Sequence, residues 1–181
     1  MTSVIVHSGN RLAAARAGAK PEIMTLVIER AGAIDALRRV NPSDVDELVA
    51  MHERCSPQTR YARWHGHTKR FPQSYLARLL ADDIAVVARR DGMLIGLGSA
   101  ARVDSVTWEI GLLVEDGWQR RGVGGQLLTE IVELAHDEGA KVIRAEVLEQ
   151  DAGLLQPLRA LGPLTVRASH GVMTADVHPW A

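Results

Sequence analysis

The 181-residue sequence lacks several features that mark secreted, membrane-bound or nucleic-acid-binding proteins. Its single cysteine, Cys55, cannot form a disulfide within the chain and is expected to be a small buried hydrophobic residue. No apolar run approaches the roughly 20 residues of a membrane span, and the N-terminus lacks the apolar core of a signal peptide. The net charge of −1 provides no overall field that would attract nucleic acid or a membrane. These absences predict a globular protein of a reducing cytoplasm.

Motifs for common phosphate ligands and metals are also missing. The Gly-Lys-Ser/Thr ending of a Walker loop is absent, and the glycines at 122, 124 and 125 do not have the dinucleotide spacing Gly-x-Gly-x-x-Gly. The pair His65 and His67 has no third ligand at a matching spacing. We therefore expect no metal site.

The stretch 109–128 combines a buried strand, a polar loop and the start of a helix. The strand Ile110–Val114 is continuously apolar, as in strands that are covered on both faces. Two arginines and three glycines follow, and the helix from about Val123 to His136 carries a broad apolar stripe. Because the first N–H groups of a helix lack helical partners and glycines let a phosphate approach closely, this turn is typical of an anion site. The alternative is a glycine-rich turn without a ligand.

Hydrophobic periodicity and turn residues divide the rest of the chain. Residues 1–33 carry no sustained pattern and are expected to form a poorly ordered extension before one domain over residues 34–181. Strands are predicted at 34–40, 84–89, 93–103, 106–114, 142–148, 164–168 and 172–177. Helices are predicted at 44–54, 58–65, 75–80, 123–136 and 152–161, with Pro157 either bending the last helix or opening a second turn. This order predicts an α/β (α+β) fold whose mixed, mostly antiparallel sheet of about seven strands has helices on both faces.

The residues Gln119-Arg120-Arg121-Gly122-Val123-Gly124 resemble the Q/R-x-x-G-x-G/A pyrophosphate loop of the GNAT N-acetyltransferases. The predicted order of elements also agrees with the GNAT fold over residues 34–177. The resemblance implies that acetyl-CoA is the co-substrate, with its pantetheine arm between the strands at 106–114 and 142–148. A later segment, 147–155, resembles a coenzyme-lining segment in which the family has asparagine where Asp151 stands. The cofactor-binding residues that the resemblance implies are Leu112, Leu113, Val114, Gln119, Arg120, Arg121, Gly122, Val123, Gly124, Gly125, Asp151 and Leu155.

A second resemblance lies in the first half of the chain. The segment Ser56-Pro57-Gln58-Thr59-Arg60-Tyr61-Ala62-Arg63-Trp64 is similar to the S-P-x-S-x-Y-x-R-F segment of the bacterial Pat-like protein lysine acetyltransferases. Threonine replaces the second serine and tryptophan replaces phenylalanine. Tyr61 and Trp64 are three residues apart on one helix face, and we expect them to anchor the core rather than to contact the substrate.

Glu109 is the candidate catalytic residue. A lysine-like amine has an ordinary pKa near 10.4, so its deprotonation at pH 7 costs roughly 4–5 kcal/mol. A partly desolvated carboxylate on a central strand is a suitable base, and the GNAT family places its catalytic glutamate at the spacing that separates Glu109 from Gln119. The alternative is a structural glutamate at an exposed strand end, paired with an arginine. Glu115 and Asp116 are chemically competent bases, but we expect them to cap the loop.

Two further groups are needed for acetyl transfer. The oxyanion is expected to accept a hydrogen bond from a backbone N–H within Leu112–Val114. Many GNAT enzymes use a tyrosine on a late helix to protonate the leaving thiolate. Since no tyrosine follows Tyr75 here, we expect water to supply that proton.

The acceptor is less closely defined by the sequence. The segment Arg54–Arg70, which borders the acceptor channel in GNAT folds, has five basic and no acidic residues. Such a rim favours acidic surroundings of the acceptor amine. We predict an N-acetyltransferase, monomeric or homodimeric, that acts on a primary amine, with a protein lysine as the first choice. The alternatives are a small-molecule amine acetyltransferase and a non-catalytic acetyl-CoA-binding regulatory module.

Overall fold

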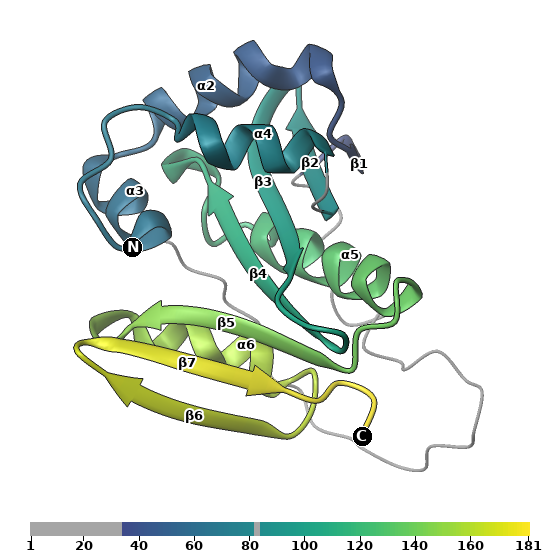
Figure 1. Ribbon diagram of the computed structural model, residues 1–181. Helices are drawn as coiled ribbons and strands as arrows, with labels where there is room; N and C mark the ends of the chain where they lie inside the picture. The colour runs from purple at the N-terminus through teal and green to yellow at the C-terminus, as the bar shows by residue number, and fades with distance from the viewer. Residues whose placement is uncertain (1–33, 82–83) are drawn as a thin grey trace.

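The computed structural model describes residues 34–81 and 84–181, which form a seven-stranded sheet with helices on both faces (Figure 1). The strands are β1 (Ala36–Arg39), β2 (Ile84–Arg90), β3 (Met93–Arg102), β4 (Thr107–Val114), β5 (Val142–Leu148), β6 (Leu164–Ser169) and β7 (Val172–Val177). They lie in the order β1-β2-β3-β4-β5-β7-β6, and only β4 and β5 are parallel neighbours. The predicted fold class is confirmed. The extension predicted for residues 1–33 lies outside the described residues.

The helices follow the predicted pattern with one informative difference. They are η1 (Pro42–Asp44), α2 (Val45–Arg54), α3 (Pro57–Trp64), α4 (Gln73–Ala81), η2 (Asp116–Trp118), α5 (Val123–Asp137), η3 (Glu149–Leu155) and α6 (Gln156–Arg159). The single helix predicted at 152–161 is divided into η3 and α6, because Pro157 lies in the first turn of α6, where its missing N–H is tolerated. Within the described ranges, no helix is both long and apolar enough to cross a membrane.

The sheet is built largely from hairpins with tight turns. Asp91 and Gly92, between β2 and β3, have φ angles of 49° and 78°. His170 and Gly171, between β6 and β7, have φ angles of 51° and 80°. Two consecutive positive φ angles match the type I′ turns that suit the twist of antiparallel strands. These turns fix the register of the strands that carry the site.

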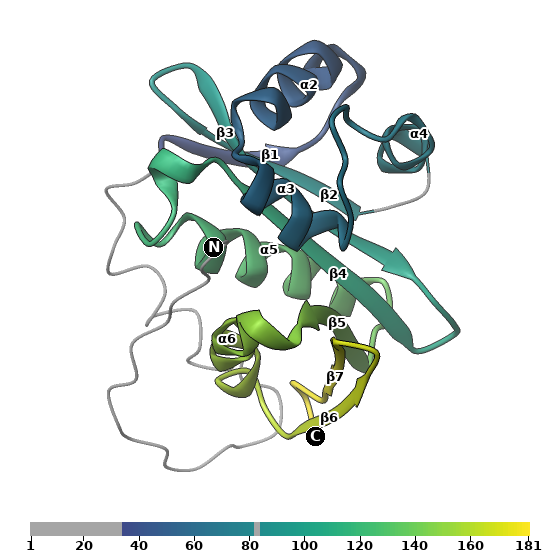
Figure 2. The same ribbon diagram turned by 90° about the vertical axis from the view of Figure 1, so that its left-hand side faces the viewer.

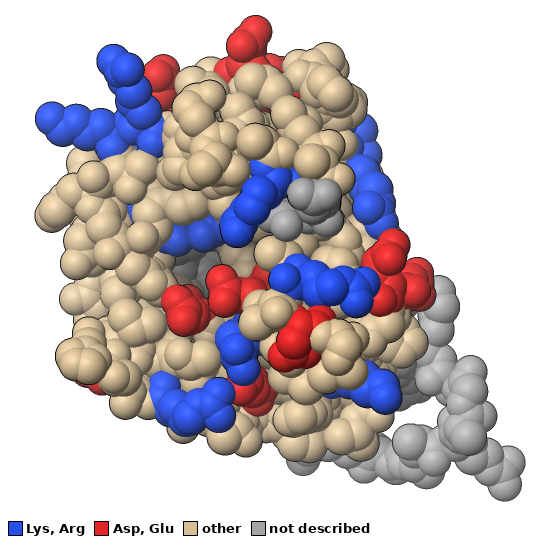
Figure 3. Space-filling model, in the orientation of Figure 1, with Lys and Arg blue, Asp and Glu red and all other residues tan. Residues whose placement is uncertain are grey.

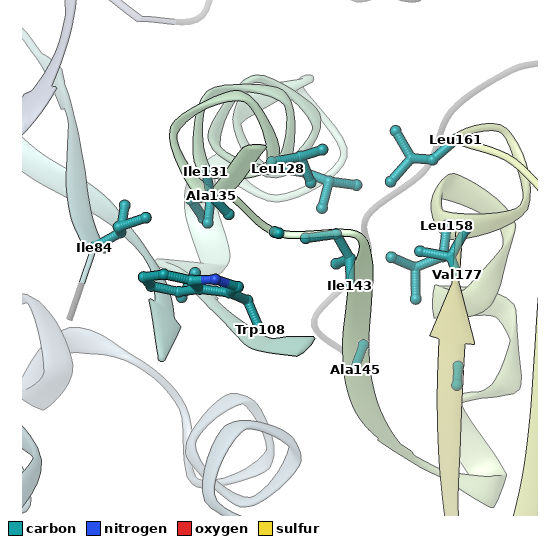
Figure 4. Close-up of a cluster of buried hydrophobic side chains, with 14 of the residues drawn as sticks. Ile84, Trp108, Leu128, Ile131, Ala135, Ile143, Ala145, Leu158, Leu161 and Val177 are labelled. Carbon is teal, nitrogen blue, oxygen red and sulfur yellow. The ribbon is translucent and has the colours of Figure 1, made fainter. Parts of the chain in front are cut away.

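One face of the sheet packs against α5 and α6 (Figure 2). Trp108 of β4 is only 3% exposed and lies in one cluster with Ile131 and Ala135 of α5 (Figure 4). Gly98 of β3 makes room for this helix, since a Cβ there would lie 2.2 Å from Cδ1 of Ile131. Leu158 and Leu161 close the same core from the α6 side (Figure 4). This packing holds β4 and β5 at their shared end.

The other face packs against α2, α3 and α4. Trp64 is anchored as expected, because its indole N–H donates to Nε2 of buried His52 at 3.0 Å and its ring packs against Phe71. Tyr61, also half-buried, instead contacts His67 in a tilted arrangement, with ring centroids 5.1 Å apart. Cys55 is buried as predicted, and that burial, aided by nearby carboxylates, raises the pKa of its thiol to about 12.

The parallel strands β4 and β5 separate part of the way along their length. They pair over four positions, from Thr107 opposite Val142 to Ile110 opposite Ala145. Beyond that point β4 continues to Val114 and β5 to Leu148 without pairing to each other. Figure 1 shows the two strands diverging into a wedge. The candidate site lies at this wedge.

Candidate active site

The wedge leaves backbone groups of β4 without strand partners. The C=O of Thr107 accepts from the N–H of Val103 on the β3 side, and the N–H of Glu115 donates to the C=O of Ile95 on that side. Peptide groups alternate in direction along an antiparallel pair. The N–H groups of Leu112 and Val114 are therefore directed toward β5, past the end of its pairing with β4.

The three predicted β4 residues do not share one environment. By the same alternation the N–H of Leu113 is directed toward β3, and its side chain is fully buried among α2 and α4 residues. Leu112 lines the cavity at the wedge. The C=O of Val114 accepts from Nε2 of Gln119 at 2.9 Å. Leu112 and Val114 thus provide the N–H donors available to a ligand in the wedge.

A cavity of about 330 Å³ passes through the wedge from one face of the sheet to the other. Its walls on the side of α3 and α4 include Arg63, Tyr75 and Ser99. On the side of α5 and α6 they include Leu128, Leu154, Pro157 and Leu158. Glu109 and Glu146 lie where the strands separate. The cavity therefore connects an apolar half with a half rich in charge.

Glu109 lies on the same face of β4 as Leu113, toward α3 and α4. Its side chain is exposed to the cavity, yet partial enclosure by the cavity walls raises its pKa and the negative charge of Glu146 raises it further. The positive charges of Arg63, Arg144 and Arg78 offset only part of this rise. No described residue forms a hydrogen bond to this carboxylate or an ion pair with it within 4.0 Å. The neighbouring arginine in register, Arg144, instead binds Asp176 through Nε and Nη2 at 2.7 and 3.1 Å. Glu109 is thus a cavity carboxylate whose pKa is closer to neutrality than that of an ordinary glutamate.

The glycine-rich loop lies on the other side of the wedge and begins α5. Gly122 precedes the helix with a φ of 89°, a conformation that favours glycine. Gly124 and Gly125 are buried in the first turn, where the N–H groups lack helical partners. Arg120 and Arg121 are exposed, and the Arg121 guanidinium lies 5.3 Å from the ring of Trp118. This arrangement has the donors and the cations of an anion site.

The side chain of Gln119 makes two hydrogen bonds within the protein. Its Nε2 donates to Oγ1 of Thr59 at 3.0 Å as well as to the carbonyl of Val114. That carbonyl lacks a strand partner because β5 has turned away, so the amide of Gln119 replaces the missing ladder bond. Its side chain therefore joins the loop to β4 and α3.

The Ser-Pro-x-Thr segment holds the loop through Asp116. Ser56 donates from its N–H at 2.8 Å and from its hydroxyl at 2.7 Å, and the Thr59 hydroxyl donates at 2.8 Å. Burial opposes the charge of Asp116, but these hydrogen bonds outweigh it and the pKa of the carboxyl is lowered. The adjacent Glu115 forms an ion pair with Arg54 at 2.9 Å. Both carboxylates are engaged in holding the loop rather than facing the cavity.

The segment after β5 contributes to the cavity through residues adjacent to those predicted. Leu155 is 2% exposed and belongs to the core, whereas its neighbour Leu154 lines the cavity. Asp151 is half-buried, and its φ and ψ of −107° and 24° interrupt η3. The irregular backbone, which a sequence pattern does not define, decides which of these side chains is directed into the wedge.

Sequence reasoning did not identify Tyr75, Ser99 or Glu146 as site residues. Tyr75 and Ser99 hydrogen-bond to each other through their hydroxyls, and Nη2 of Arg63 donates to the same Tyr75 oxygen. Ser99 lies opposite Gly111 in the β3–β4 register, so extension of the hairpin pairing would have placed it near Glu109. The hollow on this face has basic side chains above it and acidic ones below it (Figure 3).

Comparisons with known proteins identify the family and support the fold. Residues 45–159 match the acetyltransferase (GNAT) family. No curated protein matches the chain at the level of sequence. Among solved structures, the GNAT domain of PAT from S. lividans is 23% identical, with a TM-score of 0.69 over 78% of this chain and 89% of that one.

Two further solved structures contain the coenzyme. YncA from Salmonella typhimurium, with its cofactor acetyl-CoA, is 20% identical, with a TM-score of 0.61 over 81% of this chain and 94% of that one. PaiA N-acetyltransferase from Thermoplasma acidophilum, in complex with coenzyme A, is 17% identical, with a TM-score of 0.63 over 79% of this chain and 98% of that one. At these identities the solved structures support the fold, and the family match covers most of the described domain. The chain belongs to the acetyltransferase (GNAT) family.

Proposed function

We propose that this protein transfers an acetyl group from acetyl-CoA to a primary amine, with Glu109 as the general base. The observation that carries the proposal is the position of Glu109. It is a carboxylate whose pKa is raised because burial and Glu146 outweigh the positive charges of nearby arginines, and it lies in the cavity where β4 and β5 separate. A base of this kind is suited to take a proton from an amine near neutral pH.

The residues on the loop side fit the diphosphate of a coenzyme. The buried glycines Gly124 and Gly125 allow close approach to the first turn of α5, and the guanidinium groups of Arg120 and Arg121 supply charge. Acetyl-CoA supplies the thioester whose acyl carbon is attacked. The N–H groups of Leu112 and Val114 are directed into the wedge and would stabilise the oxyanion.

Glu109 would act as the C–N bond to the amine forms and the C–S bond of the thioester breaks. The proton lost by the amine passes to the Glu109 carboxylate, directly or through water. The sulfur leaves as a thiolate and takes a proton from water. Lysine-like amines are protonated at neutral pH, so removal of this proton is a large part of the barrier.

The acceptor that we propose is a protein lysine. Its support is the resemblance of the segment 56–64 to the Pat-like lysine acetyltransferases. The second candidate is a small amine that carries a carboxylate, because Arg63 and Arg78 line the half of the cavity that faces α3 and α4.

The test is acetyl transfer to a mixed panel of amines. Purified protein is incubated with acetyl-CoA and lysine peptides, amino acids or simple amines, while thiol release and the mass of each acceptor are followed. We expect thiol release that depends on the acceptor and matches a mass gain of one acetyl group. Tight acetyl-CoA binding by calorimetry, with no acceptor-dependent thiol release for any amine, would identify a binding module instead.

A further inference from the structure

Arg63 occupies a position on the sheet that only glycine allows. An ideal Cβ at Gly111 would lie 2.4 Å from Nη2 of Arg63 and 2.6 Å from its Cζ. The guanidinium therefore lies directly on β4, next to the wedge. The Trp64 and Tyr75 rings flank it at 4.4 and 4.9 Å, and the Tyr75 oxygen accepts a hydrogen bond from its Nη2. The side chain is held in place on several sides.

This guanidinium has no acidic partner within 4.0 Å in the part of the chain that the structure describes. It is half-buried and lines the cavity, whereas Arg144 on the neighbouring strand is neutralised by Asp176. A guanidinium has five N–H donors, and the bond to Tyr75 uses one of them. A partly desolvated cation with spare donors is a site for an anion that comes from outside the chain.

The coenzyme's phosphates do not account for this site. The glycine loop with Arg120 and Arg121 begins α5, which packs on the opposite face of the sheet. Arg63 lies on the face of α3 and α4, beside Glu109. An anion at Arg63 therefore belongs to the acceptor.

We propose that Arg63 binds a carboxylate that the acceptor carries close to its reactive amine. The inference rests on the proposed function, because it places the amine at Glu109. The backbones of Glu109 and Gly111 are two residues and about 7 Å apart on one face of β4, so the guanidinium over Gly111 lies beside the base. One acceptor can span this distance if its amine and its carboxylate are a few atoms apart.

The charges of the cavity match such an acceptor. Glu109 and Glu146 attract an ammonium group at the wedge, and Arg63 attracts the carboxylate. The carboxylate can come from a free amino acid or from an acidic residue next to a lysine in a protein. Both sources present the same chemistry to Arg63, and matched acceptors separate them.

The experiment compares acceptors in which a carboxylate is replaced by its uncharged amide, with each rate corrected for the fraction of neutral amine, because the amide also lowers the amine pKa. The small-molecule arm pairs glycine, β-alanine and 4-aminobutyrate with their amides, and the peptide arm pairs Asp-Lys with Asn-Lys sequences. Each pair is measured with wild type, Arg63→Gln and Gly111→Ala, whose Cβ displaces the guanidinium. Arg70→Gln is the matched control, because it removes one exposed charge from the same basic segment without lining the cavity. Circular dichroism establishes that each variant is folded.

We expect wild type to prefer the carboxylate by about 10- to 100-fold in kcat/KM, the range of a charge-assisted bidentate contact. Arg63→Gln and Gly111→Ala should abolish this preference through KM, and Arg70→Gln should retain it. A preference in the small-molecule arm alone identifies a free amino acid, and one in the peptide arm alone identifies a lysine beside an acidic residue. Equal rates for acids and amides in wild type would overturn the inference and leave the proposed function standing.

A binding measurement covers the case in which no amine is acetylated. Trp64 lies against the guanidinium, so a carboxylate at Arg63 should change tryptophan fluorescence. A saturable change with 4-aminobutyrate, absent with its amide and absent in Arg63→Gln, would support the anion site while the proposed reaction failed. No change in wild type would contradict the anion site.

Discussion

The proposed coenzyme side and the proposed acceptor side of the wedge are built in different ways. The coenzyme side uses backbone N–H groups of one continuous segment, from the end of β4 into the first turn of α5. The acceptor side uses side chains from four separate segments, with Arg63 on α3, Tyr75 on α4, Ser99 on β3 and Glu109 on β4. Changes on the first side should therefore alter acetyl-CoA affinity, whereas changes on the second side should alter the rate of transfer and the preference among acceptors.

The largest effect is expected for the base. Glu109→Gln keeps the shape and removes the carboxylate, so the rate at neutral pH should fall by about 10²–10⁴-fold, the usual contribution of a general base. Acetyl-CoA affinity should hardly change, because the proposed phosphate site lies on the other side of the wedge. Calorimetry and steady-state kinetics separate these quantities, with Glu138→Gln, at the exposed end of α5, as the control.

The same variant carries a stability expectation with a defined sign. Folding raises the pKa of Glu109, so the ionised carboxylate disfavours the folded state at neutral pH. Glu109→Gln should therefore keep the melting temperature or raise it. A lower melting temperature together with weaker coenzyme binding would indicate a structural glutamate.

The next largest effect is expected for variants of the glycine-rich loop, which should alter coenzyme binding alone. Replacing Arg120 and Arg121 by alanine should weaken acetyl-CoA binding by roughly 10- to 100-fold through loss of charge-assisted contacts. Gly124→Glu should weaken it at least as much, since a buried carboxylate would meet the diphosphate. The preference among acceptors should stay the same. Unchanged coenzyme affinity in both variants would remove the loop from the coenzyme site.

Loss of the hydrogen bonds that join α3 to the loop should have a smaller effect. Ser56→Ala combined with Thr59→Val removes the hydroxyls that bind Asp116 and the acceptor for Gln119. We expect a melting temperature lower by roughly 3–8 °C and weaker acetyl-CoA binding, because the loop is no longer held on α3. Gln58→Ala, on the exposed face of the same helix, is the control. Full stability in the double variant would show that the loop holds its shape alone.

The smallest effect on activity is expected at a buried ion cluster far from the wedge. Arg38 and Arg89 bind Asp44, which is 1% exposed, and the hydrogen bonds from Arg38 lower the pKa of its carboxyl to about 2 despite burial. Because the folded-state pKa is the lower one, this stabilisation is complete above about pH 4 and is lost as pH falls through about 2. Thermal melts from pH 5 to pH 2 should decline less steeply in Asp44→Asn than in wild type. Parallel declines would contradict the assignment.

The sequence defines the proposed coenzyme side more completely than the proposed acceptor side for a physical reason. A strand, a glycine turn and a helix N-terminus form an anion site locally, so Gly122 and its neighbours could be assigned without the tertiary fold. Arg63 and Ser99 are 36 positions apart, and only the β3–β4 register and the packing of α3 bring them together. Gln119 shows a further limit of sequence-based prediction. Its side-chain amide donates to the carbonyl of Val114, which the diverging strands leave unpaired, and this contact depends on the tertiary fold.

The most direct test of the central claim is the ratio of wild-type to Glu109→Gln kcat/KM for one amine between pH 5 and pH 9. The fraction of neutral amine is the same for both enzymes at each pH, so it cancels in the ratio. Because burial and Glu146 raise the pKa of Glu109, the ratio should climb from near unity through an apparent pKa above that of an ordinary glutamate. It should then reach a plateau, because the protonation of the amine affects both enzymes alike. A ratio near unity across the whole range would contradict the role of Glu109 as the base.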